Sequence, residues 1–432
     1  MSEPLAAFSD PARILCFLCA LMVPCAIAGL ALINAGLGRS RSAAHSLVGA
    51  LCVAGVAALA YFAAGFAIQG YVGLPAHEIV ANGKLWSWAG AGQPFFGGLR
   101  FDGAPASLAA LLGIFSAALV AMIPLGAGAD RWKLGASCVS TAILAALIFP
   151  LFAHWSWGGG WLAQLGANAG LGAGFTDAGG AGAIQVVGGL SALAIAWVLG
   201  PRRGKYSMEG MPAAIPGHNA VLVLFGCFLA WFGWMGLDCA GALLYSGTDA
   251  SRVALIAVNA TLGAAAAGLA AAGITRARFT RTDASLCANA WVAGLVASSA
   301  GCALLNPAES VIVGLVAGAL AVFSVEWLEL RLTVDDPGGA ISVHALGGLW
   351  GLMAVGLFAP AGSSGQWLAQ LIGVATLLGF VLPLAYGLNR LLDRFYRQRV
   401  APEGERQGLD LYELGAGAYP DFMTHSDDTW QR

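Results

Sequence analysis

Long apolar stretches separated by short polar connections recur along the whole chain of 432 residues. Each stretch can cross a hydrocarbon layer of about 30 Å as a helix, which takes about 20 residues. The pattern therefore predicts an all-α polytopic membrane protein with eleven transmembrane helices. The predicted spans are residues 12–35, 46–68, 106–128, 134–154, 180–199, 218–240, 253–273, 284–304, 310–330, 339–359 and 367–389.

The positive charges between these spans alternate in number. Connections after odd-numbered spans are rich in arginine and lysine, as in the segment PRRGK at 201–205. Connections after even-numbered spans hold only Lys84, Arg100 and Arg252. Because short cytoplasmic loops carry an excess of positive charge, this alternation predicts an N-terminus outside and a cytoplasmic C-terminus.

One glycine-rich phrase occurs twice within this apolar sequence. It reads DAGGAGAIQVVGG at 177–189 and DPGGAISVHALGG at 336–348, with Gln185 and His344 at the same central place. The first copy opens a span that runs inward, and the second opens a span that runs outward. A phrase that enters the membrane from both faces predicts an inverted repeat of five plus five helices.

The spacing within the repeat predicts where its polar residues lie. Gln185 and His344 each follow their Asp by eight residues, which is about 12 Å of helix. If Asp177 and Asp336 lie near the two membrane faces, both central residues reach the middle of the membrane and face each other. A polar residue inside a span is expected to be functional, although a glutamine can also join helices. The two Asp residues can cap helix starts, and they can also act electrostatically on a cation.

The chain then divides into a transmembrane domain and a tail. The predicted units are residues 1–389 for the transmembrane domain, 12–199 for repeat one, 218–359 for repeat two, 367–389 for an extra span and 390–432 for a cytoplasmic tail.

Composition agrees with a membrane protein. Hydrophobic residues make up 58% of the chain and charged residues 10%, whereas soluble domains carry about 25% charged residues. The nine cysteines follow no metal-site spacing and lie mostly in apolar runs. No hydrolytic constellation, phosphate-binding loop or metal cluster is evident, so we expect no enzyme, no cofactor and no metal site.

With these residues in view, the chain resembles the ammonium transporter family (Amt/Mep/Rh) over almost its whole length. The segments that carry the resemblance are FFGGL at 95–99, HWSWGGGWL at 154–162, DAGGAGAIQVVGG at 177–189, GPRRGKY at 200–206, GHNAVLVLFGCFLAWFGWMGLD at 217–238, AGLVASSAGC at 293–302, VDDPGGAISVH at 334–344 and GLDLYELGAGAY at 408–419. The resemblance implies a homotrimer in which each protomer holds its own narrow pore.

The resemblance also implies roles for particular residues. An outer aromatic site would bind ammonium, a gate of stacked phenylalanines would follow, and two histidines would guide ammonia at the centre. In this sequence Trp157 matches the aromatic wall, Cys227 falls near the hydroxyl donor, and Ser116 or Phe115 falls at the first gate position. Val223 or Leu224 falls at the second gate position. Asp177 matches the family's Asp at the start of span five, and Asp336 opens the second copy.

The central pair departs most from the family pattern. His344 matches the second histidine, but Gln185 stands in place of the first. A glutamine amide forms hydrogen bonds but does not titrate, whereas a histidine changes charge near neutral pH. We therefore expect ammonium or ammonia transport with altered proton handling. The alternatives are an ammonium sensor that conducts poorly and a pore for another small solute.

Further expectations concern location and partners. The resemblance implies a multi-pass protein of the plasma membrane, which is the inner membrane if the source is bacterial. Besides the lipid bilayer and ammonium, a P-II signal protein is a possible partner at the cytoplasmic tail, and nucleic acid is not expected.

Overall fold

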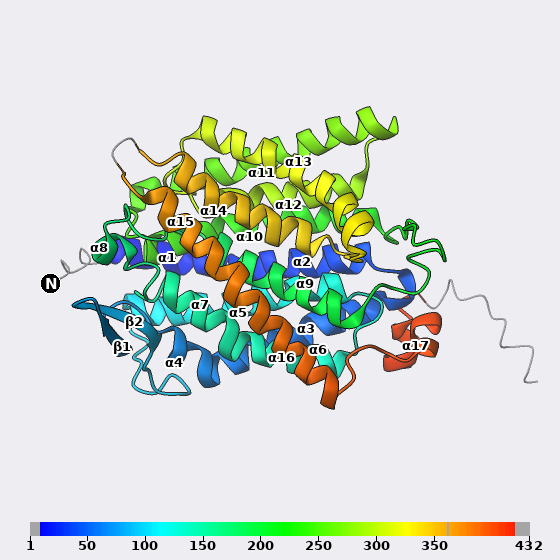
Figure 1. The fold of residues 1–432 in the computed structure, drawn as a ribbon, viewed down its shortest axis with the longest axis horizontal. Coiled ribbons are helices and arrows are strands. Elements are labelled where there is room, and N and C mark those ends of the chain that lie inside the picture. The colour runs from blue at the N-terminus through cyan, green and yellow to red at the C-terminus, as the bar shows by residue number, and fades with distance from the viewer. Residues whose placement is uncertain (1–8, 361–362, 420–432) are drawn as a thin grey trace, which may run out of the picture.

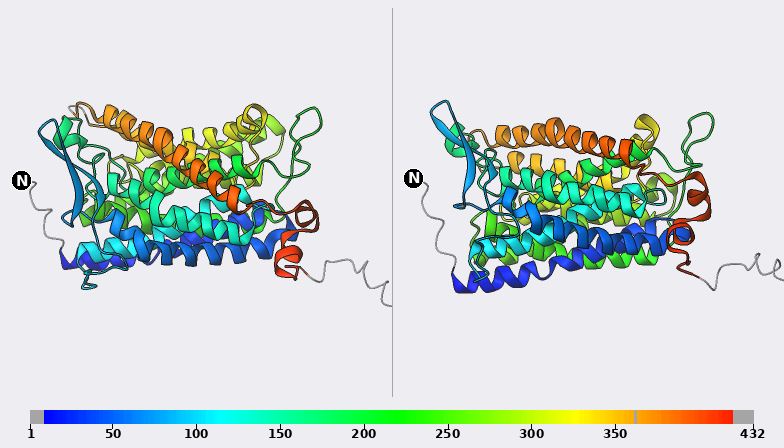
Figure 2. Two further views of the ribbon diagram at one scale, coloured as in Figure 1. Left: turned by 60° about the horizontal axis from the view of Figure 1, so that its bottom comes forward. Right: turned by 90° about the horizontal axis from the view of Figure 1, so that it is seen from below.

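The computed structural model describes residues 9–360 and 363–419. Its helices run side by side along the long axis, and a small β-hairpin lies at one end (Figure 1). The opposite end carries α17 (Pro402–Gln407), and Figure 2 shows both features projecting beyond the helix bundle. We call these two ends the hairpin end and the tail end.

Residues 9–199, the described part of the first half of the chain, contain nine α-helices, two strands and four shorter helical turns. These elements are α1 Asp10–Ala20, α2 Val23–Leu37, η1 Ser40–Ser42, α3 Ala43–Ala60, η2 Tyr61–Gly65, α4 Phe66–Gln69, β1 Ala76–Ala81, β2 Lys84–Gly90, α5 Pro105–Gly128, α6 Leu134–Ile143, η3 Leu144–Ile148, α7 Phe149–Ser156, α8 Leu165–Ala169, η4 Ala181–Val186 and α9 Val187–Leu199.

The second half of the chain and the tail are helical in the part that the structure describes. The elements are α10 Ala220–Tyr245, η5 Ala250–Arg252, α11 Val253–Phe279, α12 Ala284–Ser299, α13 Pro307–Leu332, η6 Ile341–Leu346, α14 Gly347–Leu357, α15 Gln366–Thr376, η7 Leu377–Val381, α16 Leu382–Phe395, α17 and η8 Asp410–Leu414.

Most of the predicted spans are found as long apolar helical segments. Within residues 9–360 and 363–419, nine segments are long and apolar enough to cross a membrane. The two other predicted spans are also apolar and helical, but shorter, at Ala284–Ser299 and Ile341–Leu357. The polytopic helical architecture therefore agrees with the hydrophobic pattern.

The all-α prediction missed the hairpin of β1 and β2. Its two-residue turn consists of Asn82 and Gly83, both with positive φ angles of 52° and 71°. An Asn-Gly pair favours a turn whose twist matches that of the flanking antiparallel strands. The sequence signal was therefore present, but it lies in a connection between two apolar spans.

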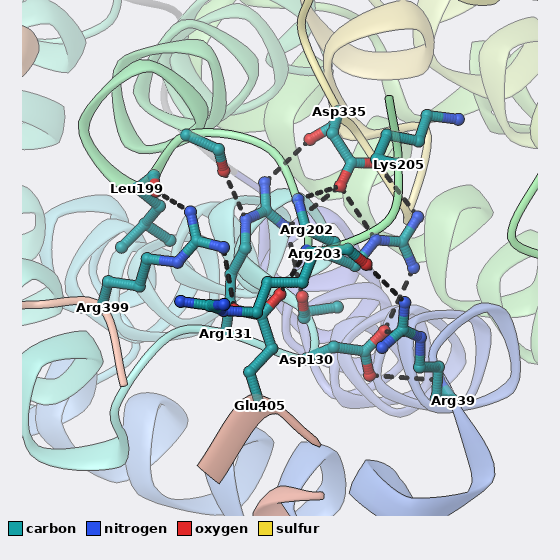
Figure 3. Close-up of polar contacts among 12 residues, drawn as sticks. Arg39, Asp130, Arg131, Leu199, Arg202, Arg203, Lys205, Asp335, Arg399 and Glu405 are labelled. Carbon is teal, nitrogen blue, oxygen red and sulfur yellow. Dashed lines mark hydrogen bonds and ion pairs between the residues drawn. The ribbon is translucent and has the colours of Figure 1, made fainter. Parts of the chain in front are cut away.

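A buried ionic cluster joins the loops at the tail end (Figure 3). Arg202 pairs with Asp335 at 2.9 Å and with Asp130 at 3.1 Å. Arg131 donates to the backbone oxygens of Gly200 and Asp335 at 2.7 and 2.9 Å. Because each buried charge has partners, this cluster fixes three loops that follow different helices.

The tail docks on the same end through its carboxylates. Asp410 accepts from the backbone N–H groups of Ala44 and His45, at the start of α3. Glu413 contacts the His45 ring at 2.8 Å and accepts from the backbone N–H of Leu134. The predicted tail is thus folded against the helices up to residue 419, and residues 420–432 lie outside the described residues.

Asp335→Asn is expected to lower the unfolding temperature in detergent at neutral pH. The substitution removes the counter-charge of Arg202 and Arg131, and breaking such a buried pair costs about 3 kcal/mol. Burial alone would raise the pKa of Asp335, but hydrogen bonds from Arg202 and the charge of Arg131 lower that pKa to about 2.

The same pKa sets the pH dependence of this effect. A carboxylate with a depressed pKa stabilises the fold above its ordinary pKa, and this stabilisation is lost as the pH falls toward the folded pKa. The difference in unfolding temperature between wild type and variant should therefore stay constant from neutral pH to about pH 4 and shrink as the pH falls from about 4 toward 2. Tryptophan fluorescence melts would measure it, with exposed Asp102→Asn as control. A pH-independent difference would contradict the assignment.

Candidate functional site

The two copies of the repeated phrase adopt the same local structure. Asp177 accepts from the backbone N–H groups of Gly182 and Ala183 at 3.0 and 2.8 Å. Asp336 accepts in the same way from Ala340 and Ile341 at 3.0 and 2.7 Å. Both Asp residues therefore cap a helix start, which was one of their two expected roles.

Both capped segments begin with a turn of π-helix. The turn η4 contains Gln185, and the turn η6 contains His344. Such wide turns are rare and often occur at functional sites, because they shift one side chain relative to the regular helix. The structure thus places the two central polar residues in equivalent and unusual backbone positions.

Glycines let the two segments cross in direct contact. A Cβ atom on Gly189 would overlap the backbone nitrogen of Ala345, and a Cβ atom on Gly348 would lie 2.8 Å from the backbone oxygen of Ala181. Each copy thus contributes a glycine at which the other copy makes its closest approach. Small residues of this kind allow helices in a membrane to pack with their backbones touching.

The crossing brings Gln185 and His344 together. The Nδ1 atom of His344 lies 2.8 Å from the Oε1 atom of Gln185, and both side chains are buried. Because an amide oxygen only accepts, Nδ1 carries the hydrogen and donates, which leaves Nε2 as the acceptor of a neutral ring. The Nε2 amide group of Gln185 is buried and has no hydrogen-bond partner among the described residues.

A tryptophan fixes the histidine ring from the side of α10. The Trp234 ring stacks over His344 with ring centroids 6.4 Å apart and planes 26° apart. Its indole N–H donates to the hydroxyl of Ser299 at 2.9 Å. The imidazole is therefore held by a hydrogen bond on its edge and by an aromatic ring on its face.

A cavity of about 710 Å³ opens at the hairpin end. Its walls include Trp157, Tyr245 and Asp177. The Trp157 and Tyr245 rings stack in parallel with centroids 4.5 Å apart, and the Trp157 indole donates to the backbone oxygen of Asp177 at 2.7 Å. An aromatic wall next to a carboxylate is suited to a small cation.

The structure does not bring Cys227 to this cavity, and this corrects the sequence prediction. Tyr245, which contacts Trp157, ends α10, whereas Cys227 lies eighteen residues earlier, or about 27 Å along the helix. The Cys227 thiol instead approaches the backbone oxygen of Ala288. The sequence reasoning misplaced the register along a long helix that carries few polar landmarks.

Like Cys227, the two residues predicted for the second gate position lie away from the cavity. Val223 packs against Gly36, near the tail end, and 41% of the Leu224 surface is exposed. On α5, Ser116 is buried and its hydroxyl has no partner among the described residues, while Phe115 is only partly buried. α5 packs on η4 and α9, so Ser116 and Phe115 stay on a helix that borders the crossing.

Sequence reasoning missed two residues on α10 that lie near the site. Tyr245 covers Trp157, and Asp238 is a fully buried carboxylate beside Gly179. Asp238 is the only acidic residue in α10, which was a usable signal because carboxylates in apolar spans are rare.

Comparison with known protein families gives a match over almost the whole chain. A model of the Ammonium Transporter Family matches residues 14–419. The chain belongs to the ammonium transporter family. Its Gln185–His344 pair and the cavity at its hairpin end therefore lie in a member of a transporter family, and family membership gives no indication of an enzyme.

Named relatives within the family cover most of the chain. Ammonium transporter Amt2 of Archaeoglobus fulgidus is 36% identical over 426 residues, which span 94% of this chain and 87% of the relative. The ammonium transporter of Bacillus subtilis is 31% identical, over 94% of this chain and 98% of the relative.

Solved structures of the family share the fold. A structure named Sensor Amt Protein is similar with a TM-score of 0.83 at 29% identity, over 93% of this chain and 97% of that one. Mep2 of Candida albicans has a TM-score of 0.76 at 24% identity, over 96% of this chain and 92% of its own, and this likeness concerns the fold alone.

Gly189→Ala is expected to destabilise this family member, because the new methyl group would meet the backbone of Ala345 at the crossing. Overpacking of this kind costs about 1–3 kcal/mol. The matched control is Gly387→Ala on α16, where a Cβ atom meets nothing within 4 Å. Thermal unfolding in detergent would compare the two, and equal melting temperatures would rule out close packing at Gly189.

Proposed function

We propose that the chain transports ammonium across a membrane by passing ammonia between Gln185 and His344. The observation that carries this proposal is the buried hydrogen bond between the two side chains, which leaves the amide NH₂ group of Gln185 unpartnered. An unsatisfied buried donor costs about 1–3 kcal/mol, so its retention is best explained by a ligand that accepts from it.

The chemistry of that donor selects neutral ammonia. Ammonia has a lone pair and can accept from the Gln185 N–H group, whereas ammonium has four N–H donors and no lone pair. Gln185 Oε1 already accepts from His344, and the unpartnered atom of the amide is its NH₂ nitrogen, whose hydrogens repel the N–H donors of ammonium. We infer that ammonium loses its proton before the nitrogen reaches Gln185.

The outer cavity supplies the preceding binding site in this proposal. The aromatic rings of Trp157 and Tyr245 and the carboxylate of Asp177 would attract a cation at the cavity wall. Gln185 cannot then carry the proton as a histidine would, because an amide does not titrate. Ser116, at the place where the resemblance implies a gate phenylalanine, leaves a small side chain beside the pathway.

We also propose the membrane arrangement. The chain would cross eleven times, with the two shorter apolar helices counted as spans, as an inverted five-plus-five repeat. The membrane would be the plasma membrane. The hairpin end would lie outside the cell, and the tail end would lie in the cytoplasm. The equivalent Asp caps of the two copies and the arginine-rich tail end support this arrangement.

The assembly proposal is a homotrimer with one pathway in each protomer. Aromatic side chains are exposed along one face of α10, which must be covered by lipid or by another protomer. The exposed aromatic residues of this face are Phe225, Phe228 and Phe232. A P-II signal protein remains a proposed partner for the tail end, where Asp410 and Glu413 fix the tail.

Gln185→His is expected to raise the ammonium-evoked current several-fold, because a titratable ring would replace a non-titrating amide at the centre. Solid-supported-membrane recordings on proteoliposomes would measure the current of both forms. Equal currents would show that position 185 does not limit proton transfer.

His344→Ala is expected to abolish the current and ammonium uptake, because it removes the ring that orients Gln185. His218→Ala is the matched control, since His218 contacts Tyr419 at the tail end and lies outside the pathway. Unchanged uptake in His344→Ala would remove His344 from the pathway. Ammonium binding without any current in the wild type would instead favour a sensor.

A further inference from the structure

The helix α10 carries one acidic residue, Asp238, in an otherwise apolar sequence. Asp238 is fully buried, and neither of its carboxylate oxygens has a hydrogen-bond partner among the described residues. Among the described residues, no lysine, arginine or histidine forms an ion pair with Asp238. An ionised carboxylate without partners is costly in a membrane interior, so this group is expected either to bind a cation or to hold a proton.

Along α10, Asp238 lies between the outer cavity and the central pair. Its carboxylate reaches the Cα of Gly179, where a Cβ atom would overlap Oδ1. Gly179 and Ala178 are held in place by backbone bonds to Ser299 and Ala300 at 2.9 and 3.0 Å. Ala178 and its neighbour Asp177 also form part of the cavity wall.

Asp238 is also one helical turn from the residue that covers the histidine. Trp234 precedes it by four residues on α10, so both side chains lie on the same helix face. Since Trp234 stacks over His344, Asp238 lies on the hairpin side of that stack. Along α10, the Asp238 carboxylate therefore lies at a level between the cavity and the imidazole.

A second free carboxylate oxygen belongs to Asp177, two residues before the Gly179 that Asp238 contacts. Asp177 uses Oδ2 to cap η4, but its Oδ1 is buried without a partner. The neighbouring titratable groups are the thiols of Cys239 and Cys302, and the Cys302 thiol donates to the backbone oxygen of Asp238. Two carboxylates close together in a buried site repel each other when both are ionised, and a proton from an arriving cation relieves this repulsion.

We propose that Asp238, assisted by Asp177, is the proton acceptor that converts ammonium to ammonia before the Gln185–His344 pair. This inference rests on the proposed transport function and deepens it. One N–H bond of ammonium breaks and leaves its electron pair on nitrogen, while an O–H bond forms on the Asp238 carboxylate. Neutral ammonia moves on, and the acid returns to carboxylate when it passes the proton to a water molecule of the pathway.

The assignment to Asp238 follows from what the neighbouring groups already do. Gln185 does not titrate, and the Oδ2 atom of Asp177 is committed to two backbone N–H groups at a helix start, which favour its ionised form. The Asp238 carboxylate has no such commitment. It is therefore the group whose charge state changes most readily when a cation arrives.

The test combines a direct readout of the carboxyl group with a transport measurement. Infrared difference spectra of the reconstituted wild type, taken upon addition of ammonium chloride, should show a new carbonyl band of a protonated carboxylic acid. Asp238→Asn should remove this band and lower the ammonium-evoked current about 100-fold, the order expected when a proton acceptor is lost. Asp238→Glu should restore part of both signals, and exposed Asp102→Asn should change neither.

The possible outcomes separate this inference from the proposed function. An Asp238→Asn variant with a wild-type melting temperature, an unchanged band and an unchanged current would overturn the inference and leave transport intact. A band shift to that of an ionised carboxylate on ammonium binding would identify a cation site in place of a proton acceptor, and would also overturn it. A wild type that shows neither an ammonium-evoked current nor ammonium uptake would contradict the proposed function, while the infrared band would still report on Asp238.

Discussion

The contact between Gln185 and His344 depends on two helical segments crossing with their backbones in contact. Glycines at Gly189 and Gly348 make this crossing possible, because a side chain at either place would meet the backbone of the other segment. The two Asp caps and the two π-helical turns then set the depth and direction of the central side chains. The hydrogen bond of 2.8 Å is the result of this backbone geometry.

The buried charges of the ionic cluster at the tail end pair with one another, whereas two buried carboxylates toward the hairpin end form no ion pair among the described residues. At the tail end, Arg202, Asp130 and Asp335 satisfy one another, and the pKa of Asp335 is lowered to about 2 by its arginine partners despite burial. On the hairpin side of the central pair, Asp238 and one oxygen of Asp177 have no partner among the described residues. Paired charges stabilise a fixed structure, whereas unpaired buried groups are available to a ligand or a proton. This contrast places the chemistry near the cavity and the scaffold near the tail.

The sequence predicted the large features because they follow from periodic and repeated signals. Long apolar runs marked the helices, and the doubled phrase placed Gln185 opposite His344, which is where the structure has them. The sequence did not show in the same way which residues of α10 lie at the level of the cavity. The helix has 26 residues with few polar landmarks, so Cys227 was assigned to the level of Trp157, whereas it lies about 27 Å along the helix from Tyr245, which contacts Trp157.

Other features were missed because their signals were local. The β-hairpin was signalled by Asn82 and Gly83, within a connection that the search for spans passed over. Asp238 was visible as a lone acid in an apolar run, but its lack of partners depends on how α10 packs against the Asp177–Gly180 segment. Only the folded structure shows which buried polar atoms remain unsatisfied.

The central claim is that the free amide N–H group of Gln185 binds neutral ammonia. A high-resolution crystal structure of the protein soaked in an ammonium salt tests it most directly. The account predicts a density peak about 3 Å from Gln185 Nε2, with the Gln185 Oε1 to His344 Nδ1 bond retained. An amide rotated so that its NH₂ group donates to His344, with no density beside it, would contradict the account.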